Sequence, residues 1–352
     1  MSKFLTNKKL VPYTPGEQPR GRQYIKLNTN ESPFPPSEKA KAAAKEALDT
    51  LHLYPDPTCA ALSASMAEAL GVSTDEVILG NGSDEILFFA FSAFCDANCG
   101  AVFPSITYSF YSVFAELCKV PYTKIPLRED FTICPQNYIG LAKTIFIANP
   151  NAPTGIALQR AEIETILKNN PAHVVVIDEA YVDFGGESCV PLIHQYENLL
   201  VVQTFSKSRS MAGARLGMGI GSKALIQDLN TIKYSVNPYN INRMTMAAGM
   251  GALADADYTK KNCAEIIQNR LYTTEALTAL GFVVTPSCTN FVFAKHPQIS
   301  GQTIYSRLKE KNILVRHFDT PEITAYNRIT IGTKAQMDAF LSAIQEILEE
   351  EI

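Results

Sequence analysis

Short apolar runs alternate with helical patterns through the first two thirds of the chain. Six of these runs predict strands, at 77–79, 100–103, 144–148, 174–177, 199–203 and 216–220. Several are unbroken stretches of Val, Ile and Leu, which are typical of a sheet covered on both faces. Because helical patterns separate the runs, we expect an α/β fold with a mostly parallel sheet flanked by helices.

The pattern changes beyond about Met250. There it predicts helices at about 258–280, 302–311 and 336–349, and strands at 282–284, 291–294, 313–315 and 328–331. This order is typical of a smaller α+β domain. Near the other end, Ser37 can cap a helix that runs to about Leu51, and a second helix runs from about Thr58 to Gly71.

The first thirty-odd residues are rich in Pro, Gly and polar side chains and predict an extended arm. We expect three parts in the 352 residues. An N-terminal arm over 1–35 joins the small domain, a large domain covers 36–249, and a small C-terminal domain covers 250–352. At roughly 100–200 residues per domain, this division suits the length of the chain.

Composition and charge narrow the class of protein. Hydrophobic residues make up 46% and the formal net charge is −4, without long runs of one sign, so we expect no nucleic-acid or anionic-membrane surface. No apolar run is long enough to span a membrane, and the first twenty residues lack the apolar core of a secretory signal. The eight cysteines and five histidines show no metal-ligand spacing. We therefore expect a cytoplasmic protein without a metal site.

A Gly-rich turn after the first strand of the large domain is the first segment that suggests chemistry. Gly80-Asn81-Gly82-Ser83-Asp84 follows that strand and opens a helix. The free N–H groups of a helix N-terminus can bind an anion, and Ser83 and Asp84 stand at that position. An ordinary Gly-rich turn between a strand and a helix has the same composition, so this segment alone leaves both interpretations open.

Two further segments follow predicted strands of the same sheet. The loop 149–155 (Asn-Pro-Asn-Ala-Pro-Thr-Gly) places Asn side chains at a carboxyl edge, where open α/β sheets bind ligands. Asp178 and Glu179 end a buried strand, a costly position unless the acids are paired or functional. Such a carboxylate can hold a protonated heterocyclic nitrogen, with Tyr181 as a nearby donor. A metal-binding Asp and a helix-capping Asp are the alternatives.

The fourth segment carries a lysine among hydroxyls. Ser206-Lys207 follows the strand at 199–203, and Arg215 lies eight residues beyond Lys207. A lysine that its surroundings deprotonate can form a Schiff base, and a fixed guanidinium can bind a phosphate. An ordinary basic loop is the alternative when this segment is taken by itself.

The four segments together, in this order, resemble the fold-type-I aminotransferases that use pyridoxal 5′-phosphate. The resemblance rests on the loop 149–155, Asp178-Glu179-Ala180-Tyr181, Ser206-Lys207 and Arg215, and it covers nearly the whole chain. It implies an aspartate-aminotransferase-like fold with a large domain and a smaller one. It also implies that Lys207 forms the Schiff base and moves the substrate proton, a role that depends on the cofactor as electron sink.

The resemblance assigns cofactor contacts residue by residue. Asp178 is implied to pair with the ring nitrogen and Tyr181 to hydrogen-bond the phenolic oxygen. The implied phosphate site comprises Ser83, Asp84, Ser206 and Arg215, and Tyr108 is the aromatic residue that stacks on the ring. Tyr54 matches a tyrosine that family members present to the phosphate of the neighbouring subunit, so a homodimer is implied. Where the family loop carries an Asn before Pro-Thr-Gly, this chain has Ala152, and we expect Asn151 to reach the cofactor instead.

Flanking segments narrow the branch of the superfamily. Pro12-Tyr13, the stretch from Leu27 to Pro33, residues 176–184, Thr289-Asn290-Phe291 and residues 328–333 resemble histidinol-phosphate aminotransferases. The resemblance implies transfer of an amino group between L-histidinol phosphate and 2-oxoglutarate during histidine synthesis, which yields glutamate. Substrate contacts are expected from Tyr13, Asn30, Arg316 and Arg328. Threonine-phosphate decarboxylase and a general aromatic aminotransferase are the alternatives.

Overall fold

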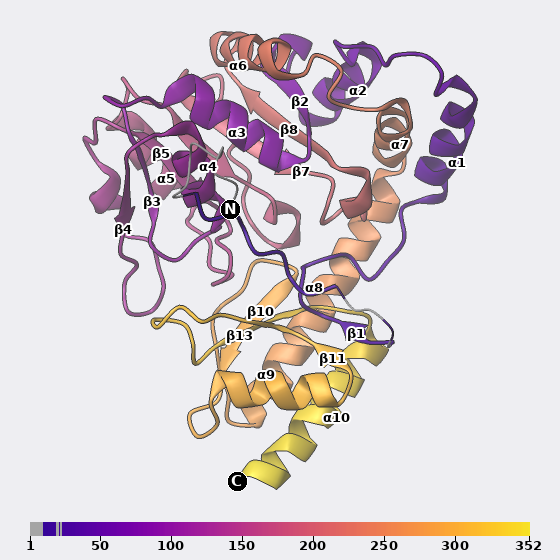
Figure 1. The fold of residues 1–352 in the computed structure, drawn as a ribbon, viewed down its shortest axis with the longest axis vertical. Coiled ribbons are helices and arrows are strands. Elements are labelled where there is room, and N and C mark those ends of the chain that lie inside the picture. Colours follow the sequence, from indigo (N-terminus) through magenta and orange to yellow (C-terminus); the bar gives the residue numbers. More distant parts are fainter. Residues whose placement is uncertain (1–9, 19–20, 22) are drawn as a thin grey trace, which may run out of the picture.

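The computed structural model describes residues 10–18, 21 and 23–352, so part of the expected arm lies outside the described residues. A seven-stranded sheet forms the larger part of the molecule (Figure 1). In sheet order its strands are β2 (Val77–Asn81), β8 (Leu216–Gly221), β7 (Leu199–Thr204), β6 (Val175–Asp178), β5 (Thr144–Ala148), β3 (Ala101–Pro104) and β4 (Tyr122–Ile125). Strand β8 runs in the direction opposite to the other six strands of this sheet.

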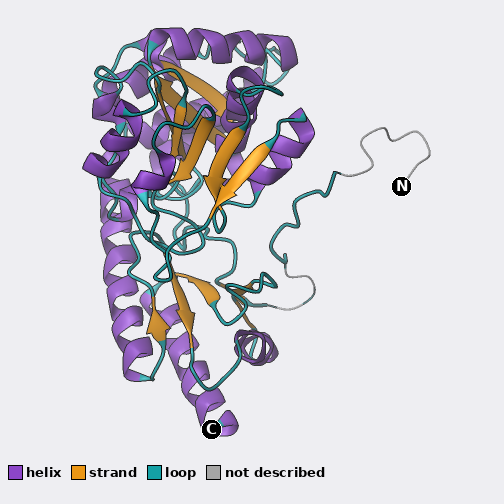
Figure 2. Cartoon of the chain, turned by 90° about the vertical axis from the view of Figure 1, so that its left-hand side faces the viewer, coloured by secondary structure: helices purple, strands orange, loops and turns teal. Residues whose placement is uncertain are grey.

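Helices cover both faces of this sheet (Figure 2). One face packs against α3 (Ser83–Phe94), α4 (Phe110–Cys118) and α6 (Lys223–Val236). The other packs against α2 (Ala60–Leu70), α5 (Arg160–Lys168) and α7 (Arg243–Leu253), and α1 (Glu38–Glu46) lies on α7. The unbroken apolar strands arise from this double cover, because successive side chains of a strand point to opposite faces. In β5, Ile145 and Ile147 enter one core while Phe146 enters the other.

A smaller antiparallel sheet lies in the C-terminal part of the chain. Its order is β12 (Arg316–His317), β13 (Asn327–Thr330), β10 (Phe291–Lys295) and β9 (Val283–Val284). Helices α9 (Gly301–Glu310) and α10 (Lys334–Glu351) contribute to the core that covers it, together with the long helix that precedes β9. The long helix α8 (Ala256–Ala279) runs from the large sheet to the small one (Figure 1).

The later residues of the expected N-terminal arm join this smaller part. Strand β1 (Ile25–Lys26) pairs in parallel with β11 (Ile313–Leu314). Leu27 is buried in the C-terminal core, and its carbonyl accepts a hydrogen bond from the N–H of Thr330. The boundaries of the expected arm and domains stay our proposal.

The α/β fold and all six strands predicted for the large sheet are confirmed, each to within two residues. The pattern missed β4, an edge strand whose residues are only partly covered, and the two-residue strands β1 and β12. These segments are too short or too exposed to show a strand period. Among the described residues, no helix is both long enough and apolar enough to cross a membrane.

Helices α1 and α7 approach closely at Gly251, and this contact generates a prediction. A Cβ added at Gly251 would lie 2.5 Å from the carbonyl oxygen of Lys39 and 2.8 Å from the Cα of Ala40. Because α1 must shift to accept it, Gly251→Ala should lower the free energy of unfolding by about 1–3 kcal/mol in urea denaturation. Gly213→Ala is the control, since a Cβ there meets nothing within 4 Å. Equal stability of the two variants would contradict the close approach.

Candidate active site

The carboxyl ends of the parallel strands meet at one edge of the large sheet, facing the smaller sheet. Ser83 follows β2, Asp178 ends β6, Lys207 follows β7, and Arg215 directly precedes the antiparallel β8. A cavity of about 400 Å³ lies at this edge. All the predicted site residues except Asn151 and Tyr54 line it. The lining residues are Tyr13, Asn30, Ser83, Asp84, Tyr108, Asp178, Tyr181, Ser206, Lys207, Arg215, Arg316 and Arg328.

The N-terminus of α3 and Arg215 form a cradle for an anion. Gly82 has φ +81°, and a Cβ there would lie 2.5 Å from Nη2 of Arg215. A Cβ on Gly217 would lie 2.2 Å from the backbone nitrogen of Ser83. Two glycines therefore let the guanidinium and strand β8 approach the start of the helix. Helix N–H groups, an arginine and the Ser83 and Ser206 hydroxyls are a donor set that fits a phosphate.

Asp84 connects this cradle to Tyr108. Its Oδ2 lies 2.9 Å from Nη2 of Arg215, and its Oδ1 accepts a hydrogen bond of 2.7 Å from the Tyr108 hydroxyl. Burial, followed by the charge of Asp84, raises the pKa of Tyr108 far above its ordinary value. Tyr108 therefore remains a donor, and its ring is held at the cavity wall.

Asp178 is a buried carboxylate, 5% exposed, at the end of the central strand β6. It accepts hydrogen bonds from the Tyr111 hydroxyl at 3.0 Å and from the N–H of Ala180 at 3.2 Å. Burial raises the pKa of Asp178 to about 6. Neither donor is a cation, so a protonated ring nitrogen in the cavity fits this carboxylate as its counter-charge.

Glu179, its neighbour in the sequence, serves a different purpose. Its carboxylate accepts hydrogen bonds from Ser188 Oγ at 2.7 Å, Gln203 Nε2 at 2.8 Å and the N–H of Cys189. Successive strand residues point to opposite faces, so the pair Asp178-Glu179 is divided between the cavity and the protein interior. Burial raises the pKa of Glu179 to about 7.

Lys207 and Tyr181 lie together in the cavity. The Lys207 Nζ is 3.4 Å from the carbonyl oxygen of Thr29 and 5.7 Å from the centre of the Tyr181 ring. Asn30, expected to contact substrate, donates from Nδ2 to the Tyr181 hydroxyl at 2.9 Å, and its Oδ1 accepts from Thr330 at 3.0 Å. The structure therefore places Asn30 as the group that orients Tyr181, with its amide already engaged.

Two arginines face the cavity from the smaller sheet. Arg316 of β12 and Arg328 of β13 are directly opposite each other in the register. Arg328 donates from Nη2 to the carbonyl oxygen of Asn28 at 3.1 Å, while its buried Nε has no hydrogen-bond partner among the described residues. Burial lowers the pKa of Arg328, and the charge of Arg316 adds to this effect. Like charges opposite each other are unfavourable, so the pair fits an anionic ligand.

Two predicted contacts are not brought to the cavity. Asn151 donates to the Ile106 carbonyl and to Thr154 Oγ1, both at 3.0 Å, and accepts from Thr107 Oγ1 at 2.8 Å. This expectation is corrected, because hydrogen bonds within the protein occupy the whole amide, and Ala152 lines the cavity instead. Tyr54 is 78% exposed and lies outside the cavity of its own chain.

Sequence reasoning missed Tyr111, whose hydroxyl contacts Asp178. Its position contains a signal, since it lies three residues after Tyr108 and its N–H bonds the Tyr108 carbonyl within one turn. Residues three apart on such a turn lie on the same side. A second tyrosine at this spacing therefore lies beside the first.

The burial of Asp178 predicts how the protein without ligand responds to pH. Because the pKa of Asp178 is about 6 in the folded state and near 4 in the unfolded chain, ionising it costs stability as the pH rises from about 4 to 6. Asp178→Asn should therefore raise the free energy of unfolding by about 1–3 kcal/mol at pH 8, less at pH 5. Denaturant titration at both pH values checks this. Asp228→Asn, on the exposed side of α6, is the control, and an equal gain there would contradict the burial cost.

Comparison with known proteins agrees with this geometry. The family "Aminotransferase class I and II" matches residues 22–344. A histidinol-phosphate aminotransferase of Brachyspira hyodysenteriae is 49% identical over 99% of this chain and 100% of its own length. The structure of a Sinorhizobium meliloti histidinol-phosphate aminotransferase in complex with pyridoxal-5′-phosphate is similar with a TM-score of 0.91 at 23% identity, covering 99% of this chain and 98% of that one.

A related decarboxylase shows what the fold leaves open. An L-threonine-O-3-phosphate decarboxylase of Porphyromonas gingivalis has a TM-score of 0.81 at 22% identity, over 92% of this chain and 99% of that one. The fold alone is therefore shared between two reaction classes, whereas the full-length identity of 49% is found with an aminotransferase. The chain thus belongs to the class I and II aminotransferases and, among them, to the histidinol-phosphate aminotransferase family.

Proposed function

We propose that this protein transfers the amino group between L-histidinol phosphate and 2-oxoglutarate, giving imidazole-acetol phosphate and glutamate, as a step of L-histidine biosynthesis. The observation that carries the proposal is the pair of arginines opposite each other on β12 and β13. Arg316 and Arg328 line the cavity together, and Arg328 keeps a buried Nε free of partners among the described residues. The full-length identity to histidinol-phosphate aminotransferases supports the same substrate.

The cavity fits pyridoxal 5′-phosphate as cofactor. The N–H groups at the start of α3, together with Ser83, Ser206 and Arg215, would hold its phosphate, and Asp178 its protonated ring nitrogen. Tyr181 would donate to the phenolic oxygen, and Tyr108 would pack on the ring. When bound, pyridoxal phosphate supplies a carbonyl carbon for the amino group and a ring that withdraws electrons from the substrate Cα–H bond.

Lys207 is the residue we assign to proton movement. Its Nζ donates to the carbonyl oxygen of Thr29 at 3.4 Å, within a cavity that Asp178 and Tyr181 also line. An uncharged amine at this position can take the proton from the substrate Cα. Asn30 holds the Tyr181 hydroxyl in place from the opposite side.

The two arginines can bind the anionic group of the substrate in each half-reaction. A phosphate carries nearly two negative charges, and two guanidinium groups offer it several hydrogen bonds in a fixed geometry. Tyr13 lines the cavity near them, with its ring centre 4.7 Å from that of Phe110. In the second half-reaction the same cations are available for the distal carboxylate of 2-oxoglutarate.

A single-turnover absorbance titration tests the substrate. L-histidinol phosphate should convert the lysine-bound cofactor to the amino form at lower concentration than phenylalanine or O-phosphothreonine. Better conversion by phenylalanine would identify a general aromatic aminotransferase. Release of carbon dioxide from O-phosphothreonine would identify a decarboxylase. Lys207→Ala should abolish conversion, and turnover retained in that variant would contradict the role of Lys207.

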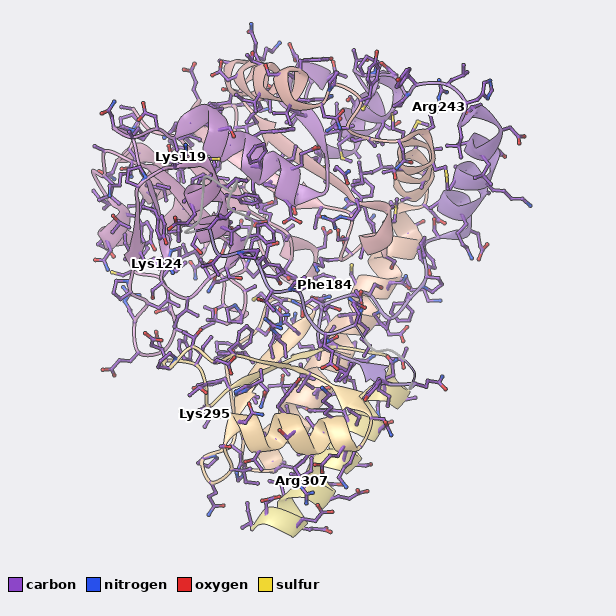
Figure 3. All side chains as sticks on the ribbon, viewed as in Figure 1. Lys119, Lys124, Phe184, Arg243, Lys295 and Arg307 are labelled. Atoms are coloured by element: carbon purple, nitrogen blue, oxygen red, sulfur yellow. The ribbon has the colours of Figure 1, made fainter. Side chains whose placement is uncertain are left out.

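The arginine pair generates a second measurement. Removing a buried charged group from a phosphate typically costs a few kcal/mol, so Arg328→Gln should weaken binding of histidinol phosphate by about tenfold or more. Arg307→Gln is the matched control, because Arg307 pairs with Glu310, Glu350 and Glu351 near the C-terminus (Figure 3). An unchanged affinity in Arg328→Gln would contradict its contact with the substrate.

We also propose that the protein is a homodimer. Exposed apolar side chains are frequent in the segment that leads to Tyr54, at Leu48, Leu51 and Leu53, and at Val236 and Tyr239. Tyr54 stacks on Tyr239 with ring centres 4.8 Å apart, and Arg243 donates to the Leu53 and Tyr54 carbonyl oxygens (Figure 3). Clusters of exposed apolar side chains mark protein interfaces, and a second copy of the chain is the occupant that gives Tyr54 a role.

Mixed dimers test the position of Tyr54. If Tyr54 completes the site of the partner subunit, a Lys207→Ala chain and a Tyr54→Ala chain form one intact site per mixed dimer. Random mixing of the two weakly active variants should then restore about a quarter of wild-type activity. Arg307→Ala in place of Tyr54→Ala is the control for additive behaviour, and its mixture with Lys207→Ala should stay at the average of its two parents. Activity that stays at the average of the two parent variants would contradict a site shared between subunits.

We propose a cytoplasmic location, with small-molecule substrates and neither nucleic acid nor a membrane as partner. All eight cysteines are free thiols in the structure, and Cys59, Cys189 and Cys263 are buried. Free buried thiols suit a reducing compartment. The net charge of −4 also makes the protein unsuited to an anionic polymer or surface.

A further inference from the structure

Tyr111 is held rigidly beneath the cavity. Its side chain is fully buried at the start of α4, within an aromatic cluster. Its ring centre lies 5.7 Å from that of Phe103, 5.9 Å from that of Phe146, and 5.7 Å from that of Tyr108, which it meets edge-on at 89°. Because three neighbouring rings hold the Tyr111 ring, its hydroxyl oxygen has a fixed position.

This hydroxyl points toward Asp178. The Tyr111 hydroxyl donates to Oδ2 of Asp178 at 3.0 Å, and the N–H of Ala180 donates to Oδ1 at 3.2 Å. Tyr111 is therefore the side-chain donor on this carboxylate within the described part of the chain. Burial raises the pKa of Tyr111 well above its ordinary value, so the hydroxyl keeps its proton and can only donate here.

Two charged groups and one neutral group from other parts of the chain lie near the same carboxylate. Asp84 of α3 disfavours its charge, and Lys207, which follows β7, favours it. Tyr108, ahead of α4, is a neutral neighbour whose hydroxyl is bonded to Asp84. Burial disfavours the carboxylate charge more strongly than any of these groups. The hydrogen bond from Tyr111 is the largest effect that opposes burial.

We propose that Tyr111 is a positioning residue that keeps Asp178 ionised. The proton that Asp178 and the ring nitrogen of the cofactor share then stays on the nitrogen. The inference rests on the proposed function, since it concerns the pyridine ring that Asp178 would hold. A donor to a carboxylate stabilises its charged form over its neutral form. Without the hydroxyl, the proton moves from the ring nitrogen to Oδ2 of Asp178, and both partners become neutral.

Tyr111→Phe is the variant that tests this, because it removes the hydroxyl and keeps the ring that packs against Phe103 and Phe146. In protein freed of cofactor and labelled with ¹³C at the aspartate carboxyls, the signal that Asp178→Asn removes belongs to Asp178. Tyr111→Phe should raise the pKa read from this signal by about 1, as expected for loss of one hydrogen bond to a charged acceptor. An unchanged titration would overturn the proposal.

A second readout uses bound cofactor. With pyridoxal phosphate labelled with ¹⁵N in the ring, the wild type should show a protonated nitrogen, and Tyr111→Phe should show a shift toward the unprotonated nitrogen. The kcat should fall about tenfold with little change in KM for histidinol phosphate, since one pKa unit is a tenfold change in the proton equilibrium. A change in KM alone would show a structural role only and would overturn the proposal.

Two controls separate this action from loss of packing. Tyr138→Phe removes another buried hydroxyl, one that has no hydrogen-bond partner among the described residues. It should change neither the carboxyl titration nor the ¹⁵N signal. In an Asp178→Asn background, Tyr111→Phe should leave the ¹⁵N signal unchanged, because the group through which it acts is absent. A further shift in that background would overturn the proposal.

The experiment distinguishes this inference from the proposed function. The carboxyl titration needs neither cofactor nor substrate, and the ¹⁵N measurement needs cofactor alone. A protein that binds pyridoxal phosphate and responds to Tyr111→Phe, but does not react with histidinol phosphate, would refute the proposed substrate and support the role of Tyr111. A protein that transaminates histidinol phosphate while Tyr111→Phe titrates like wild type would refute only the role of Tyr111.

Discussion

A carboxylate buried at the end of a central strand governs the arrangement of this cavity. Asp178 stands where β6 ends, 5% exposed, with two neutral donors and a raised pKa. An ion in that position lowers the stability of the protein without ligand, since burial favours its neutral form. A cationic ring nitrogen reverses the sign of that interaction. The fold therefore holds Asp178 as a charge without a counter-charge, and a cofactor that supplies the counter-charge binds more tightly for that reason.

The opposite wall of the cavity carries uncompensated positive charge. Arg316 and Arg328 lie side by side on β12 and β13, and the half-buried Arg328 lies among aromatic rings, 5.3 Å above Phe291 and 5.8 Å above Phe318. Two adjacent cations disfavour each other until an anion lies between them. The large sheet supplies the carboxylate and the small sheet supplies the guanidinium groups. A cofactor held at Asp178 and a substrate anion held at the two arginines would therefore meet between the two sheets.

Rigidity comes from neighbours that orient each functional group. Asn30 holds the Tyr181 hydroxyl, Asp84 holds both Tyr108 and Arg215, and Tyr111 holds Asp178. Asn30 lies after β1, far from Tyr181 in the chain, so the later part of the expected arm takes part in the site. Side chains fixed in this way lose little conformational entropy when a ligand binds, which favours tight and specific binding.

The amino-acid sequence by itself determined the α/β class, six of the seven strands of the large sheet and the candidate residues that follow them. Unbroken apolar runs require two covered faces, and parallel strands bring Ser83, Asp178 and Lys207 to one edge whatever the details of packing. These are local patterns combined with a general rule of sheet geometry.

Contacts between distant segments were decided only by the tertiary structure. The amide of Asn151 is directed into the protein by Thr107 and Ile106, more than forty residues away, so Ala152 lines the cavity. Tyr111 meets Asp178 across 67 residues, and Asn30 meets Tyr181 across 151. The direction of a side chain depends on partners that the chain brings together only when it folds. A pattern along the sequence can therefore name the residues of a site before it can say which of them contact one another.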